Sequence, residues 1–65
     1  MIYERIRELR EDKGWTQQYV ADLLFVNRRT YSSYETGART MSPDILIKLS
    51  KIHNVSVDYL LGLCD

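Results

Sequence analysis

The sequence predicts an all-α fold of five short helices. Apolar residues recur at helical spacing, short oxygen-bearing side chains stand where these stretches begin, and glycine or asparagine stands where they end. No stretch alternates apolar and polar residues as a half-buried strand does. We expect residues 1–65 to form a single domain, whose core is thin because a chain of this size buries only about 60% of its unfolded surface.

The first helix is expected within residues 1–13. Its apolar residues follow helical spacing and form one stripe, made of Ile2, Tyr3, Ile6 and Leu9. Gly14 suits the left-handed conformation that commonly ends a helix.

The second and third helices are expected on either side of a short break, residues 25–27. Thr16 and Asn27 carry side-chain oxygens suited to capping the first turns of these helices, and Gly37 suits the end of the third. A connection this short prevents antiparallel packing, so the two helices must cross steeply. Such a pair is a helix-turn-helix unit, whose second helix can enter the major groove of DNA.

The fourth and fifth helices have clear start signals. Ser42 and Pro43 indicate an N-cap followed by a proline at the first helical position, and Asn54 suits the end of this helix. Ser56 is the predicted cap of the fifth helix, which ends before Gly62.

Positive charge is concentrated near the third helix, although the formal net charge of the chain is zero. Residues 27–40 contain Arg28, Arg29 and Arg39 but only one acid, Glu35. DNA affinity depends largely on local neutralisation of phosphates, so one basic face is enough for binding.

The outward face of the third helix is the predicted base-reading surface. The side chains expected there are those of Arg28, Arg29, Ser32 and Ser33. An arginine fork matches O6 and N7 of guanine, so the arginines are expected to supply most of the selectivity and the serines more modest contacts.

Other classes of function find little support in the sequence. Cys64 is the only cysteine, no Cys/His cluster indicates a metal site, and no cofactor motif is present. His53 has no acid or cysteine near it for enzyme chemistry; we expect it to interact with the negative end of the fourth helix. No apolar run reaches the roughly 20 residues that span a bilayer, and the N-terminus lacks a secretory pattern, so a cytoplasmic location is expected.

Four features together resemble the DNA-binding domain of the phage lambda repressor and Cro proteins, the class also called the XRE family. They are TQ at residues 16–17, Ala21 at the fifth position of the second helix, YETG at residues 34–37 and VSVDYLLG at residues 55–62. The resemblance covers residues 2–62. It implies a lambda-repressor-like fold and a small transcriptional regulator, most simply a repressor, that binds double-stranded DNA sequence-specifically. It also implies a nucleoid-associated homodimer on a palindromic operator.

Contacts with DNA phosphates are expected around the third helix. The backbone N–H of Gln17 lies at the positive end of the second helix, which suits a phosphate. The resemblance implies the same contact for this glutamine and also that it braces the third helix. Thr36 ends the groove-facing surface, and the resemblance adds Arg39 and Thr40 in the following loop. It further implies an ion pair between Arg10 and Glu35 that ties the first helix to the third.

The chain departs from the family pattern in the turn and on the second helix. Phe25 stands where the family usually has a left-handed glycine, and Tyr31 replaces a branched aliphatic residue. Tyr19 and Leu23 stand where the family often has charge. With Phe25 they form either an exposed apolar patch for a protein partner or additional packing over Tyr31.

Two further hypotheses concern partners. The apolar C-terminal region is the expected self-contact of a homodimer, through Val57, Tyr59, Leu60 and Leu63. The alternative to a DNA-binding regulator is a protein-interaction module with the same fold, such as an antitoxin or anti-regulator, which would use the patch of Tyr19, Leu23 and Phe25.

Overall fold

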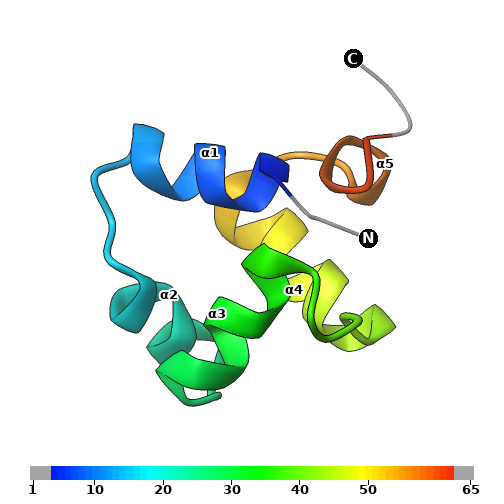
Figure 1. Cartoon of the computed structure of the whole chain (residues 1–65). Coiled ribbons are helices and arrows are strands. Elements are labelled where there is room, and N and C mark those ends of the chain that lie inside the picture. The colour runs from blue at the N-terminus through cyan, green and yellow to red at the C-terminus, as the bar shows by residue number, and fades with distance from the viewer. Residues whose placement is uncertain (1–3, 63–65) are drawn as a thin grey trace.

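A computed structural model describes residues 4–62, which form the five helices predicted (Figure 1). The described part of the chain contains no strand. The helices are α1 Glu4–Asp12, α2 Gln17–Leu24, α3 Arg28–Thr36, α4 Pro43–His53 and α5 Val57–Leu60. None of the described helices is both long and apolar enough to cross a membrane.

The helices begin at the residues that the sequence predicts as caps. Thr16 Oγ1 accepts a hydrogen bond from the Tyr19 N–H at 3.0 Å, and Asn27 Oδ1 accepts one from the Thr30 N–H at 2.7 Å. Equivalent side-chain caps start α4 and α5, from Ser42 and Ser56 respectively. Each cap satisfies a backbone donor that has no partner within its own helix.

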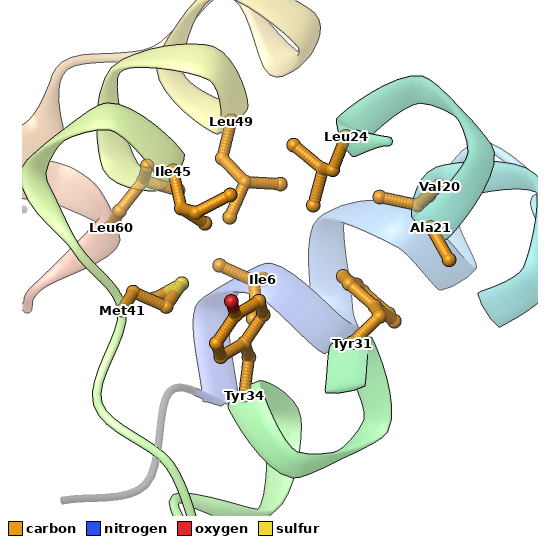
Figure 2. Packing of buried hydrophobic residues seen from close by; sticks show 10 residues of the cluster. All are labelled: Ile6, Val20, Ala21, Leu24, Tyr31, Tyr34, Met41, Ile45, Leu49 and Leu60. Atoms are coloured by element: carbon orange, nitrogen blue, oxygen red, sulfur yellow. The ribbon is translucent and has the colours of Figure 1, made fainter. Parts of the chain in front are cut away.

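All five helices contribute to one core (Figure 2). Ile6 of α1 lies between α3 and α4, and both Ile6 and Tyr31 have no exposed surface. The helix-turn-helix pair lies on one side of this core, while α5 packs beside the start of α1 (Figure 1). The buried apolar residues are Ile6, Val20, Ala21, Leu24, Tyr31, Tyr34, Met41, Ile45, Leu49 and Leu60.

Two core residues differ from expectation. Met41, in the loop before α4, is buried, although the loop has no helical periodicity that would indicate this. Leu60, expected at a dimer surface, is only 1% exposed because it packs into the protein's own core. Leu63, also expected at that surface, lies outside the described residues, as do Ile2, Tyr3 and Cys64.

Phe25 occupies a left-handed backbone conformation in the turn between α2 and α3. Its φ and ψ are 59° and 39°, and its N–H donates to the Asp22 carbonyl at 3.2 Å to close α2. This conformation disfavours residues with a Cβ by roughly 1–2 kcal/mol. The steep turn is thus formed without glycine and keeps its strain.

We expect Phe25→Gly to be more stable than Phe25→Ala by about 1 kcal/mol. Both variants lose the Phe25 ring, but only glycine tolerates the positive φ without steric cost. At Ile47, which is exposed within α4, the order of the two variants should reverse, because glycine is unfavourable inside a helix. Urea unfolding of the four variants measures their unfolding free energies. If Phe25→Ala is more stable than Phe25→Gly, as expected for the two Ile47 variants, the turn is unstrained.

His53 is buried at the end of α4 without a hydrogen-bond partner on either ring nitrogen among the described residues. Its ring centroid lies 5.6 Å from that of Trp15. Burial, followed by the nearby positive charge of Lys13, lowers the pKa of His53 below its usual value. His53 lies in the last turn of α4 as expected, but the lowered pKa favours its neutral form at pH 7, which weakens any interaction with the negative helix end.

Stability should fall as the pH drops below about 6.5, where an unfolded histidine takes up a proton. The folded pKa of His53 is the lower one, so the unfolded state binds more protons and gains free energy on acidification until the folded ring also titrates. The unfolding free energy should decline between about pH 7 and 5 in urea titrations. The unfolding free energy of His53→Phe should depend less on pH in this range, because the contribution of His53 is absent. An equal pH dependence in the variant and the wild type would contradict a neutral, buried imidazole.

Candidate nucleic-acid interface

The helix α3 has one face in the core and one face free. Tyr31, Tyr34 and Glu35 are buried, while Arg28 and Arg29 are exposed. Helical spacing of about 100° per residue places Ser32 and Ser33 on either side of Arg29, and both are partly exposed. The set predicted to read bases therefore shares one surface, which is the outer side of the helix-turn-helix pair.

The arginine pair is free to bind an external partner. Neither side chain makes a hydrogen bond or ion pair with another residue in the described part of the chain. Asn27 holds the start of α3 in place, so the two guanidinium groups project from a fixed helix end. Their charge is not neutralised within the fold.

The hydroxyl groups at the other end of α3 are already bonded. Thr36 Oγ1 donates to the Ser33 carbonyl at 3.3 Å and accepts from the Ala38 N–H at 3.4 Å. A phosphate oxygen can only accept hydrogen bonds. Thr36 could therefore bind a phosphate through its hydroxyl only by giving up the bond to Ser33.

The start of α2 carries free backbone donors. Thr16 caps the N–H of Tyr19, which leaves the N–H groups of Gln17 and Gln18 for an outside acceptor. The Gln17 side chain also braces α3, as the family resemblance implies. Its Nε2 donates to Glu35 Oε1 at 3.0 Å, which connects the start of α2 to the end of α3.

Arg10 and Glu35 form the expected ion pair in a bidentate geometry. Arg10 Nε lies 2.7 Å from Glu35 Oε2, and Nη2 lies 3.2 Å from Oε1. Arg10 Nη1 also donates to the Trp15 carbonyl at 2.9 Å. The guanidinium thus joins α1, the loop before α2 and the end of α3.

The protonation of this cluster follows from its hydrogen bonds. Burial acts to raise the pKa of Glu35, but the hydrogen bonds led by that from Arg10 outweigh it and lower the pKa below its usual value. The Tyr31 hydroxyl is buried near the same carboxylate without a hydrogen bond of good geometry, and burial, then Glu35, raises the pKa of Tyr31. At neutral pH the cluster contains one cation, one anion and a neutral phenol.

The loop after α3 places the remaining phosphate candidates on the surface. Arg39 and Thr40 are exposed. The Arg39 N–H donates to the Ser33 carbonyl at 3.2 Å, which holds the loop against the end of α3. An open groove of about 450 Å³ lies between α1, the start of α2 and the end of α3, and it is lined by Glu4, Arg7, Arg10, Gln17, Glu35 and Thr36.

The apolar side chains on α2 and the turn are exposed. Phe25 is 87% exposed, with the ammonium of Lys48 5.4 Å from its ring centroid. Tyr19 and Leu23 are also exposed, and the Tyr19 ring contacts Trp15. Phe25 therefore does not pack over Tyr31, which was one of the two alternatives for this patch. No group of His, Cys, Asp and Glu among residues 4–62 is arranged to hold a metal ion.

Comparison with known proteins assigns the chain to a family. The profile of a family described as Helix-turn-helix matches residues 6–60, a span that includes α2, the turn and α3. The chain belongs to the XRE helix-turn-helix family.

Several curated XRE relatives are similar over most of this chain. It is 42% identical over 62 residues to the HTH-type transcriptional regulator AnsR of Bacillus subtilis, a match that covers 95% of the chain and 53% of AnsR. It is 42% identical over 59 residues to the regulator ImmR of the same organism, covering 91% and 46% of the two chains. The competence pilus inhibition repressor of Acinetobacter baylyi is 38% identical over 64 residues, covering 98% and 58%.

The chain spans about half the length of the curated relatives AnsR and ImmR. No solved structure gives a significant match.

We expect Glu35→Ala to destabilise the fold by about 3 kcal/mol, toward the lower end of the range for a broken buried ion pair. The loss arises because the Arg10 charge and the Gln17 amide remain without their partner, and the partial exposure of Arg10 moderates it. Arg7→Ala is the matched control, because its pair with Glu11 is exposed and such pairs contribute about 0–1 kcal/mol. Equal losses of unfolding free energy in the two variants would show that the Glu35 cluster stabilises the fold no more than an exposed ion pair does.

Proposed function

We propose that this protein binds double-stranded DNA sequence-specifically as a transcriptional regulator, with α3 in the major groove. The observation that carries the proposal is the free face of α3, where Arg28 and Arg29 project without any partner in the described chain. An arginine fork suits guanine O6 and N7 in the major groove. Relatives named as transcriptional regulators and a repressor favour this role over that of an antitoxin or anti-regulator.

Phosphate contacts would position α3 in the groove. The proposed contacts are the N–H of Gln17 at the start of α2 and the side chains of Arg39 and Thr40 in the loop after α3. Thr36 stands at the same edge, with the restriction that its hydroxyl already donates within the helix end. Gln17 bonds to Glu35 near the end of α3, and the Arg39 loop is held against the same end, so these phosphate contacts would position α3 from the end opposite to its arginine pair.

The regulator would act as a homodimer on a palindromic operator, in the cytoplasm and associated with the nucleoid. In this class of protein two recognition helices lie about 34 Å apart, which is one turn of DNA. Val57 and Tyr59 remain as proposed self-contacts because both are partly exposed, whereas Leu60 is in the core. Occupying a promoter would then suffice for repression.

Selection of bound sites from a random pool of duplexes tests the proposal. The wild type should enrich a palindrome that contains guanines, and Arg28→Ala/Arg29→Ala should lose it, because each bidentate arginine contact contributes about 1–3 kcal/mol of discrimination. Lys48→Ala/Lys51→Ala removes the same charge from α4 and should leave the selected sequence unchanged. Failure of the wild type to enrich any sequence would contradict the proposal.

A further inference from the structure

The hydroxyl of Ser33 has a fixed direction on the groove-facing side of α3. Ser33 Oγ lies 2.9 Å from the carbonyl oxygen of Arg29. A carbonyl oxygen has no hydrogen to give, so the hydroxyl must be the donor in this bond. The hydrogen of Ser33 therefore points back along the helix, and only its oxygen lone pairs are available to a ligand.

We propose that Ser33 is a specificity-determining residue that acts only as a hydrogen-bond acceptor toward DNA and so selects adenine or cytosine at the base it faces. This inference rests on the proposed function, since it assumes that α3 enters the major groove. It follows from the bond to Arg29 rather than from the residue type, because a free serine hydroxyl can donate as well as accept.

The pattern of groups in the major groove converts this polarity into a base preference. Adenine N6 and cytosine N4 are donors, whereas guanine O6 and N7 and thymine O4 are acceptors. An acceptor-only oxygen can bond the first pair. When it faces an acceptor of guanine or thymine instead, neither group can donate, so no hydrogen bond forms.

The bond to Arg29 should persist when DNA binds. If Ser33 accepts from a base amino group, its bond to Arg29 is kept and a second bond is added. If it donates to a base instead, the bond to Arg29 is broken and no bond is gained overall. The backbone also holds Ser33 in place, because its carbonyl accepts from the Arg39 N–H at 3.2 Å and from Thr36 Oγ1 at 3.3 Å.

Ser32 provides a matched control on the same helix. It is also partly exposed, but its hydroxyl makes no hydrogen bond with any other residue among 4–62. Its hydroxyl can rotate to donate to one base or accept from another. The two serines therefore differ in polarity although they share a residue type and an exposed face.

The test uses the selected duplex and deletes single groups from its bases. The exocyclic amino group is removed from each adenine and cytosine of a half-site in turn, and binding is measured for wild type, Ser33→Ala, Ser33→Thr and Ser32→Ala. One such deletion should weaken wild-type binding about 2- to 10-fold, as expected for one hydrogen bond. Ser33→Ala should be insensitive to that same deletion.

The other two variants keep the effect if the inference is correct. Threonine can retain the bond to the carbonyl one turn earlier, so Ser33→Thr should remain sensitive to that deletion, and so should Ser32→Ala. If every amino-group deletion affects wild type and Ser33→Ala equally, the inference is overturned. A wild type that selects no duplex at all would instead contradict the proposed function, so the two failures are distinguishable.

Discussion

The carboxylate of Glu35 is the point on which the arrangement of the first three helices depends. It accepts hydrogen bonds from Arg10 of α1 at 2.7 and 3.2 Å and from Gln17 of α2 at 3.0 Å, while it belongs to α3 itself. A buried ion pair adds little net stability compared with apolar packing, but removing one partner is costly. The cluster therefore specifies how the helices are oriented, and the apolar core supplies most of the stability (Figure 2).

This cluster also explains how a chain without net charge can present a basic surface. The only acid on α3 is Glu35, and it faces inward, where Arg10 neutralises it. Arg28 and Arg29 face outward without an acidic partner in the described chain. The helix α3 thus separates its charges along its length, with the exposed arginines at its start and the buried acid that holds the fold together near its end. Total charge is a poor guide to such a protein, because binding depends on local charge.

The fold was largely predictable because helix starts and ends depend on local chemistry. Thr16, Asn27 and Ser42 cap their helices as their residue types indicate. What could not be predicted depends on contacts between distant parts of the chain, such as the burial of Met41 and Leu60. The family resemblance implies that Gln17 braces the third helix, and the structure adds that Glu35 is its partner. The exposure of the four predicted base-reading residues of α3 could be predicted from the sequence. The direction of the Ser33 hydroxyl could not be predicted from the sequence, because the neighbouring Ser32 has the same residue type and similar exposure but a different hydrogen-bonding state.

The proposed binding mode has a fixed α3 that places its arginine pair against guanines in the major groove. The most direct measurement is the affinity for the selected duplex after each half-site guanine is replaced by 7-deazaguanine, which keeps base pairing but lacks the N7 acceptor. At least one replacement should weaken wild-type binding about tenfold, since a bidentate arginine contact contributes about 1–3 kcal/mol. Unchanged affinity at every guanine would contradict this binding mode.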